Sequence, residues 1–213
     1  MVKLWLLVLT TLFTPKPQTL TVKQTTSILK VSVLIRAKEY RHDKKGKLQM
    51  GMIGCSGTYI SPSVVLTAAH CFEYPATDIW VRDNNGLSLR VWVMKIDPTL
   101  DLALLAAPGL KPHAFAKVAK SVRVGEGVYN VGSPQFFEFM VSEGVVGALN
   151  FVANPFLGRY TVTTAFIDHG SSGGGAFNEK GELIGVNTLM TGIFGWAGVS
   201  LAVDHTTIAK FLK

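Results

Sequence analysis

The segment from residue 65 to residue 71 reads Val65-Leu-Thr-Ala-Ala-His-Cys71, an apolar run that ends in small residues and a histidine. Valine, leucine and threonine at its start favour a β-strand. The small residues after them leave an imidazole at the end of that strand open to approach. A histidine after a strand most often has a structural role, so only a wider set of residues makes His70 a general base.

A carboxylate candidate lies in the segment Asp97-Pro-Thr-Leu-Asp-Leu-Ala-Leu-Leu105. Asp101 directly precedes a hydrophobic run, which predicts that it enters the core end of the next strand. An unpaired charge is costly to bury there, and an imidazole N–H is a suitable partner. Asp97 is the competing residue, but it precedes a proline, which is typical of a turn.

A hydroxyl candidate lies in the segment Asp168-His-Gly-Ser-Ser-Gly-Gly-Gly175. Glycines around a serine allow a tight turn and the close approach of a substrate backbone. Nucleophilic attack on an amide needs such a hydroxyl, with backbone N–H groups directed at the developing oxyanion. The alternative interpretation is a flexible glycine-rich turn without a catalytic role.

The remaining sequence predicts an all-β fold, because short apolar runs alternate with Gly, Pro, Asn and Asp and no helical pattern recurs between them. A short C-terminal helix is expected at Thr206–Leu212, with Asp204 as its N-cap, and hairpin turns at residues 83–86 and 178–181. The expected strands are Ile28–Ile35, Ser56–Ile60, Val64–Thr67, Ile79–Val81, Leu87–Ile96, Leu102–Ala106, Gly127–Val131, Phe139–Leu149, Tyr160–Ala165, Leu183–Met190 and Val199–Val203.

A change of composition at residues 107–118 indicates a connector between two halves. Each half supplies enough strands to close a small barrel, so we expect two packed six-stranded antiparallel β-barrels. The N-terminal barrel is expected at residues 28–110 and contains His70 and Asp101. The C-terminal barrel is expected at residues 111–213, with Ser172 and the terminal helix. Residues 1–27 are expected to form an apolar signal-like segment and a Thr-, Pro- and Lys-rich tether.

Taken together and in this order, the three motifs resemble those of the trypsin/chymotrypsin-like serine peptidases. The likeness covers about residues 29–212. The run Gly-Glu-Leu-Ile-Gly-Val-Asn-Thr at 181–188 is most similar to bacterial HtrA-type peptidases and related viral and phage enzymes. Because the chain ends at Lys213, the PDZ domain that those bacterial enzymes carry is not expected.

This resemblance implies a chymotrypsin-like double barrel and a serine endopeptidase that forms an acyl-enzyme. Ser172 would be the nucleophile and His70 the base that takes its proton, while Asp101 would orient and stabilise the imidazolium. The backbone N–H groups of Gly170 and Ser172 would form the oxyanion hole. Thr188 matches the hydroxyl residue that supports the aspartate in this family.

The resemblance also bears on two points that the residues alone leave open. Ser171 is a rival nucleophile, but the register Gly-x-Ser-Gly-Gly favours Ser172.

Cys55 and Cys71 could be free and buried, or they could be paired. A disulfide between them would close a loop of about 16 residues and contribute roughly 3 kcal/mol to stability. They match the disulfide that brackets the histidine strand in this family, which favours pairing. Two cysteines alone cannot supply a four-ligand zinc site, and no cofactor or metal is expected.

The family's substrate pocket maps onto a floor at Phe166 and onto walls further along the chain. With no aspartate at the floor, a preference for lysine or arginine is not expected. Asn187 stands where viral and glutamate-specific relatives often have a histidine, so we expect a modest preference for small or medium apolar P1 residues. The residues assigned to the pocket are Phe166, Leu189, Met190, Thr191 and Gly198.

The formal charge of +7 belongs to the N-terminal region. Residues 1–50 hold ten Lys and Arg against two acidic residues, whereas residues 51–213 hold eleven against twelve. The basic run at residues 36–47 contains one tyrosine and no recognisable element for reading nucleic acid, so a solvated loop between two strands is favoured over a nucleic-acid surface.

The N-terminal apolar stretch from Leu4 to Phe13 is too short to span a membrane, which takes about 20 residues. Its length and the preceding lysine fit a signal peptide, although no clear cleavage site follows, and an apolar strand or helix is the alternative. The expected localisation is therefore secreted or periplasmic, and an oxidising compartment would also suit a disulfide.

Three other functions remain as alternatives at this point. A catalytically silent double barrel would only bind its partner, and a viral enzyme would process a polyprotein. An α/β-hydrolase esterase is disfavoured, because in that fold the acidic residue and the histidine follow the serine. The natural peptide substrate and the oligomeric state are not predicted.

Overall fold

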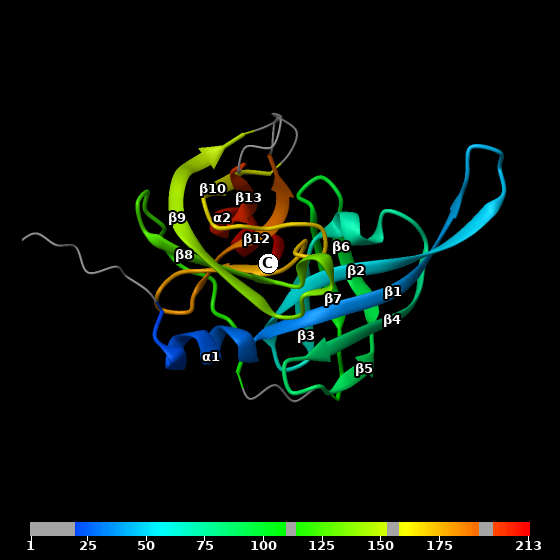
Figure 1. Ribbon diagram of the computed structural model, residues 1–213, viewed down its shortest axis with the longest axis horizontal. Coiled ribbons are helices and arrows are strands. Elements are labelled where there is room, and N and C mark those ends of the chain that lie inside the picture. Colours follow the sequence, from blue (N-terminus) through cyan, green and yellow to red (C-terminus); the bar gives the residue numbers. More distant parts are fainter. Residues whose placement is uncertain (1–19, 110–113, 153–157, 192–197) are drawn as a thin grey trace, which may run out of the picture.

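The computed structural model describes residues 20–109, 114–152, 158–191 and 198–213. Two β-structured halves lie side by side, with helix α1 (Val22–Lys30) below the second half, where β1 begins, and helix α2 (His205–Phe211) overlapping the second half in this view, next to β12 and β13 (Figure 1). Both helices are short. Among the described residues, no helix is long and apolar enough to cross a membrane.

The first half is an antiparallel sheet of seven strands within residues 32–106, in the order β5-β4-β1-β2-β3-β7-β6. A buried residue, Val91, separates β5 from β6, and its N–H donates to the carbonyl of Ile79 at 2.8 Å. The expected strand Leu87–Ile96 is therefore wrong as a single strand: the chain bends at Val91 and connects the two edges of the sheet. The strands are β1 (Ser32–His42), β2 (Leu48–Ser61), β3 (Val64–Thr67), β4 (Ala76–Asp83), β5 (Ser88–Arg90), β6 (Trp92–Asp97) and β7 (Leu102–Ala106).

The second half is a closed antiparallel barrel of six strands, counted over the described part of residues 114–213, in the order β10-β13-β12-β11-β8-β9. The chymotrypsin-like all-β fold class is confirmed, with the first half present as a curved seven-stranded sheet. Asp204 caps α2 as expected, since its carboxylate accepts from Thr207 N at 2.6 Å. The strands are β8 (Gly127–Gly132), β9 (Met140–Phe151), β10 (Tyr160–Thr163), β11 (Gly175–Phe177), β12 (Leu183–Met190) and β13 (Ser200–Asp204).

Helix α1 corrects two expectations, because residues 22–27 are not a tether and Ile28–Lys30 are not part of a strand. The helix begins with a capping box: Gln24 N donates to Thr21 Oγ1 at 3.3 Å, and Thr21 N donates to the Gln24 side chain at 2.9 Å. Such reciprocal bonds satisfy N–H groups that the first helical turn leaves unpaired. Ile28 is 1% exposed and anchors the helix in the core.

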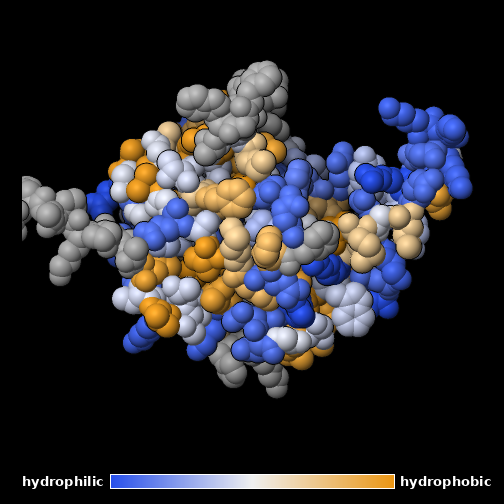
Figure 2. All heavy atoms as spheres, viewed as in Figure 1, coloured by the Kyte–Doolittle hydropathy of each residue, from blue (hydrophilic) through white to orange (hydrophobic). Residues whose placement is uncertain are grey.

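The basic run at residues 36–47 is a strand and a turn and not the expected loop. Arg36–His42 belong to β1, which pairs with β2 in a hairpin that projects from the body of the molecule (Figure 1). Only Asp43–Lys47 form the turn, where Asp43 Oδ1 accepts from the backbone N–H groups of Lys45 and Lys47. The hydrophilic tip of this hairpin is exposed, as Figure 2 shows by its blue side chains.

Among the described residues, three apolar clusters form the core. One fills the first sheet and includes Ile35 and Val81, and a second, made of smaller side chains, lies inside the barrel. The third combines residues of both halves, such as Leu66 and Phe177, with residues of the two helices. Burial of a large apolar side chain contributes about 1.5–3 kcal/mol, so this shared cluster holds the two halves together.

Candidate active site

His70 lies in a short 3-10 turn, Ala69–Phe72, that follows β3. The backbone N–H of His70 donates to Asp101 Oδ1 at 2.9 Å, and Nδ1 lies 3.0 and 2.9 Å from the two oxygens of that carboxylate. The imidazole side chain is 39% exposed, whereas the carboxylate is 16% exposed. The ring therefore has one edge held by the carboxylate and is partly open to solvent.

Asp101 precedes β7 as expected, with a left-handed backbone at φ 54°. Its second oxygen accepts a hydrogen bond from the hydroxyl of Thr188, which is buried on β12. Burial opposes ionisation, but the hydrogen bonds and charge of His70 and the bond from Thr188 together hold the pKa of Asp101 below its usual value. Asp97 lies in the turn, where its side chain accepts from the N–H groups of two following residues.

Ser172 belongs to the serine loop, residues 168–174, which contains two glycines with positive φ. A Cβ on Gly170 (φ +100°) would lie 2.4 Å from the carbonyl oxygen of Ser133. A Cβ on Gly173 (φ +81°) would lie 2.0 Å from Thr67 Oγ1. Both positions therefore require glycine for their backbone angles and for the close approach of neighbouring strands.

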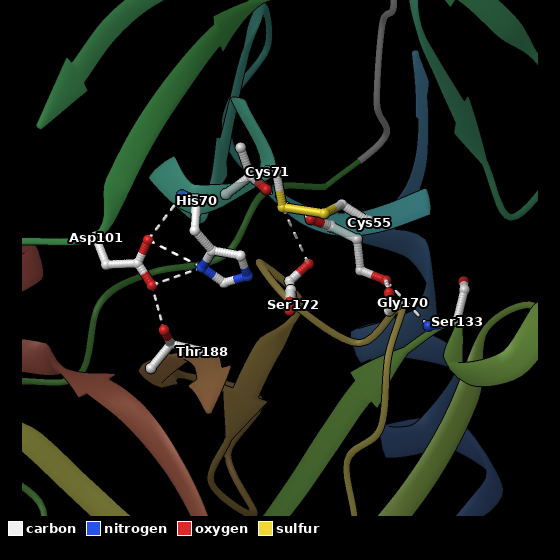
Figure 3. The surroundings of a disulfide bond; sticks show 10 residues. Cys55, His70, Cys71, Asp101, Ser133, Gly170, Ser172 and Thr188 are labelled. Atoms are coloured by element: carbon white, nitrogen blue, oxygen red, sulfur yellow. Dashed lines mark hydrogen bonds and ion pairs between the residues drawn. A yellow bond between two sulfur atoms is a disulfide. The ribbon is translucent and has the colours of Figure 1, made fainter. Parts of the chain in front are cut away.

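The two adjacent serines differ in environment. Ser171 is 3% exposed, and its hydroxyl accepts from Asp168 N at 3.3 Å inside the loop. Ser172 lies beside the imidazole, which is placed between Ser172 and Asp101 (Figure 3). Among the described residues, no hydrogen bond joins the Ser172 hydroxyl to His70. Bonds of this kind are often long in ligand-free sites.

Ser56 of β2 holds the serine loop in place, although no sequence motif singles this residue out. Its N–H donates to the carbonyl of Ser172 at 2.8 Å, and its Oγ donates to the carbonyl of Gly170 at 2.8 Å. The N–H of Ser133 donates to the same Oγ at 3.0 Å. The first sheet thereby sets the orientation of two peptide groups of the second half.

Ser56 binds the carbonyl groups of Gly170 and Ser172. The backbone N–H groups of the same two residues remain available to bind a ligand at the loop. In the described part of the chain, neither donates to a protein acceptor. Two backbone N–H groups in a fixed turn suit the binding of an anionic oxygen.

A cavity of about 290 Å³ lies at the loop. Leu189 and Met190 line it as expected, whereas Phe166, Thr191 and Gly198 are exposed and are not among its lining residues. Ile167, Asp168 and His169 line it although the sequence did not single them out. Within the described residues the lining comprises His70, Ile167, Asp168, His169, Ser172, Thr188, Leu189 and Met190.

Cys55 and Cys71 form a disulfide across 16 residues, which confirms the pairing that the resemblance implied. The bond joins β2 to the 3-10 turn that carries His70 (Figure 3). Two segments of the site are thus linked covalently. Among the described residues, no group of three or more His, Cys, Asp or Glu side chains could hold a metal ion.

Comparison with known proteins places the sequence in a family of peptidase domains. A family model described as a trypsin-like peptidase domain matches residues 55–186. A probable periplasmic serine endoprotease DegP-like protein of Pseudomonas putida is 32% identical over 166 residues, which is 76% of this chain and 34% of the relative. Serine protease HTRA1A of Danio rerio is 29% identical over 187 residues, 84% of this chain and 38% of the relative. The chain thus spans about a third of the length of these relatives.

Solved structures show the same fold. An HtrA-type protease, AlgW, with a decapeptide superposes with a TM-score of 0.81 at 18% identity, over 89% of this chain and 64% of the other. The structure of AlgW with a tripeptide gives a TM-score of 0.78 at 21% identity, over 91% and 62%. The reported relatives are bacterial and vertebrate proteins, so a viral or phage origin gains no support from them.

Proposed function

Because the chain belongs to the family of trypsin-like peptidase domains, we propose that it is a serine endopeptidase that hydrolyses peptide bonds through an acyl-enzyme. The observation that carries this proposal is the cavity that His70 and Ser172 line together, with Asp101 hydrogen-bonded to the far edge of the imidazole. The neighbouring HtrA-type structures are described with peptides, which supports a peptide substrate.

In the acylation step, Ser172 Oγ attacks the carbonyl carbon of the scissile bond while His70 Nε2 takes the hydroxyl proton. The developing oxyanion accepts hydrogen bonds from the N–H groups of Gly170 and Ser172. Collapse of the tetrahedral intermediate breaks the C–N bond, and the imidazolium returns its proton to the leaving amine. Water then attacks the ester carbonyl while His70 takes one of its protons, and the imidazolium returns that proton to Ser172 Oγ as the C–O bond breaks and the acid product leaves.

Asp101 acts on the imidazole throughout this cycle. Its carboxylate accepts from Nδ1–H, which leaves Nε2 as the unprotonated nitrogen facing the serine. The hydrogen bond from Thr188 lowers the proton affinity of the carboxylate, so the negative charge remains on Asp101 when the imidazolium forms.

The test is labelling with a fluorophosphonate probe, followed by mass spectrometry of the modified peptide. We expect Ser172→Ala to abolish labelling and casein turnover, and Ser171→Ala to retain labelling because its buried hydroxyl is not the nucleophile. Labelling that is lost with Ser171→Ala and kept with Ser172→Ala would reverse the assignment. A folded wild-type protein that neither reacts with the probe nor cleaves casein would instead be a silent binding module.

The cavity beside Ser172 supports the preference for small or medium apolar P1 residues, because Ile167, Leu189 and Met190 contribute apolar walls. A peptide library randomised at P1 measures it directly. Strong selection for arginine, glutamate or glutamine at P1 would contradict this assignment.

Export to a secreted or periplasmic location is part of the same proposal. It is supported by the apolar N-terminus, by the disulfide and by the name of the periplasmic relatives. Fractionation of cells that express the full chain, with N-terminal sequencing of the product, tests both the location and the removal of the leader.

A further inference from the structure

A second cavity, of about 440 Å³, borders the serine loop at Gly170. His169 lines it and also lines the cavity beside Ser172, so the two cavities are neighbours along the loop. Gly170 lies on the opposite side of Ser172 from Asp101 (Figure 3). A peptide whose acyl part occupies the cavity beside Ser172 therefore extends its leaving part toward the second cavity.

Strand β2 of the projecting hairpin forms one wall of this second cavity (Figure 1). Met52 and Gly54 of β2 line it, together with Arg36, which is directly opposite Gly54 in the β1–β2 ladder. Arg36 already interacts with another group of the protein. Its guanidinium is therefore not a free anchor for a ligand, and this wall offers the uncharged surface of β2.

An apolar stripe continues from this wall toward the tip of the hairpin. Alternate residues of a strand share one face of a sheet, so Leu48, Met50 and Met52 point to the same side as Gly54 and the cavity. These three residues, the hairpin stripe, are 55%, 61% and 64% exposed. At about 3.4 Å per residue the stripe is about 14 Å long. A large apolar surface therefore leads away from the serine loop.

One edge of β2 runs beside the stripe and can accept a further strand. The residues of an antiparallel strand direct their N–H groups alternately toward the paired strand and away from it. Ser56 N–H points away from β1, because it donates to the carbonyl of Ser172. The N–H groups of Gly54, Met52 and Met50 follow in the same register. Among the described strands, β3 is the other partner of β2, and it pairs only beyond Ser56. This edge therefore suits an extended peptide.

We propose that the hairpin stripe binds apolar side chains of an extended substrate segment that follows the scissile bond. This inference rests on the proposed peptidase function. Met52 belongs to both the stripe and the second cavity, so a peptide that leaves Ser172 along β2 reaches the stripe without a change of direction. Such contacts remove apolar surface of both partners from water.

The length of β2 determines which substrate residues reach the stripe. Met52 lies four residues and Leu48 eight residues from Ser56, which contacts Ser172. An extended peptide therefore meets the stripe from about the fourth to about the eighth position after the scissile bond. Because methionine side chains adapt to differently shaped partners, the stripe favours apolar segments without requiring one sequence.

The test compares peptides that share an acyl part and the first three leaving-group residues. At positions four to eight they carry either Leu alternating with Ser or Gln alternating with Ser. We expect kcat/KM to be roughly tenfold higher with Leu, as for burial of one large apolar side chain. The gain should lie in KM, because contacts far from the scissile bond are equal in the ground and transition states.

A third peptide carries the Leu-containing segment on the acyl side and is expected to gain nothing. Equal values of kcat/KM for the first two peptides would overturn the proposal. An equal gain from the segment on the acyl side would overturn it as well.

Two double variants assign the preference to the stripe. Leu48→Ser combined with Met50→Ser removes two exposed side chains on which the core does not depend, and it is expected to bring the Leu/Gln ratio close to one. Leu87→Ser combined with Met94→Ser removes the same side chains from exposed positions between β4 and β5 and on β6, and it should leave the ratio unchanged. A ratio that survives in the first double variant would overturn the assignment.

Analytical ultracentrifugation separates a substrate site from an interface between copies of this chain. A lower mass of the Leu48→Ser, Met50→Ser protein than of wild type, with an unchanged Leu/Gln ratio, would assign the stripe to such an interface and overturn the proposal.

Labelling by the fluorophosphonate probe separates the two levels of failure. A protein that reacts with the probe and cleaves both peptides equally well retains the proposed function and refutes the role of the stripe. A protein that neither reacts nor cleaves refutes the proposed function, and the role of the stripe falls with it.

Discussion

At the scale of single residues, Ser56 makes the strongest unexpected contribution, because one side chain holds the carbonyl of Gly170 and the N–H of Ser133. Ser56→Ala leaves both groups without their partner and frees the Gly170–Ser171 peptide to rotate. We expect kcat to fall about tenfold with little change in KM, because the loop that carries the Gly170 N–H, the proposed donor to the transition state, loses an anchor. Unfolding in urea should show a loss of roughly 1–2 kcal/mol. Ser63→Ala, at an exposed serine between β2 and β3, is the matched control, and an unchanged kcat in Ser56→Ala would contradict the positioning role.

A second residue-scale prediction concerns Asp101 and pH. Because the folded state lowers the pKa of this carboxyl, its ionised form adds stability above the ordinary value near 4, and that stability disappears as pH falls through the lower folded pKa. Asp101→Asn cannot ionise, so it lacks this contribution at neutral pH. The difference in unfolding free energy between wild type and variant should shrink as urea titrations move from pH 7 to below pH 4. A difference that stays constant or grows toward acid pH would contradict the assignment.

At the scale of secondary-structure elements, the disulfide links β2 to the turn of His70. Replacing both cysteines by alanine releases a loop of 16 residues, which in the chain-entropy view costs roughly 3 kcal/mol. We expect urea unfolding of the double variant to match that of the reduced wild type. A reductant should not destabilise the double variant further. Equal stability of oxidised and reduced wild type would show that the bond contributes nothing.

The helices and strands also show how much of the fold can be predicted from the sequence alone. Strand β12, Leu183–Met190, was predicted with its bounds intact because a run of apolar residues is bounded by glycine and glutamate on one side. Helix α1 was missed, since the Thr21–Gln24 capping box is a short signal among polar residues. The break at Val91 depends on a hydrogen bond to Ile79, a partner distant in sequence. Local patterns predict where strands occur, whereas bends and register depend on contacts between them.

The candidate site likewise contains residues that the sequence predicts and residues that it does not. His70, Asp101 and Ser172 carry local motifs, and the geometry brings the first two into hydrogen-bond contact. A cavity of about 440 Å³ that borders the serine loop at Gly170 could not be predicted, because its lining residues Arg36 and Gln135 come from segments about 100 residues apart and neither belongs to a motif. Sequence motifs identify reactive groups, while the surfaces that select a substrate arise only when distant segments meet.

At the scale of the whole molecule, the site spans both halves, so its integrity depends on the apolar cluster that they share. Phe177 of β11 is fully buried in that cluster. Phe177→Ala should lower the unfolding free energy by roughly 3–5 kcal/mol, through lost transfer energy and the cavity left behind. Phe151→Ala, at a phenylalanine that is 44% exposed, should cost far less.

Because the site depends on contacts between the two halves, we expect the halves to unfold together. Ser56 of the first sheet bonds to the serine loop of the second half, so separation of the halves disrupts the loop even where each keeps its strands. In a urea titration, peptidase activity and far-ultraviolet circular dichroism should decline in one coincident transition, in wild type and in Phe177→Ala alike. Activity that disappears at a clearly lower urea concentration than the β-structure would mean that the halves separate before they unfold, and that the shared cluster is weaker than its burial indicates.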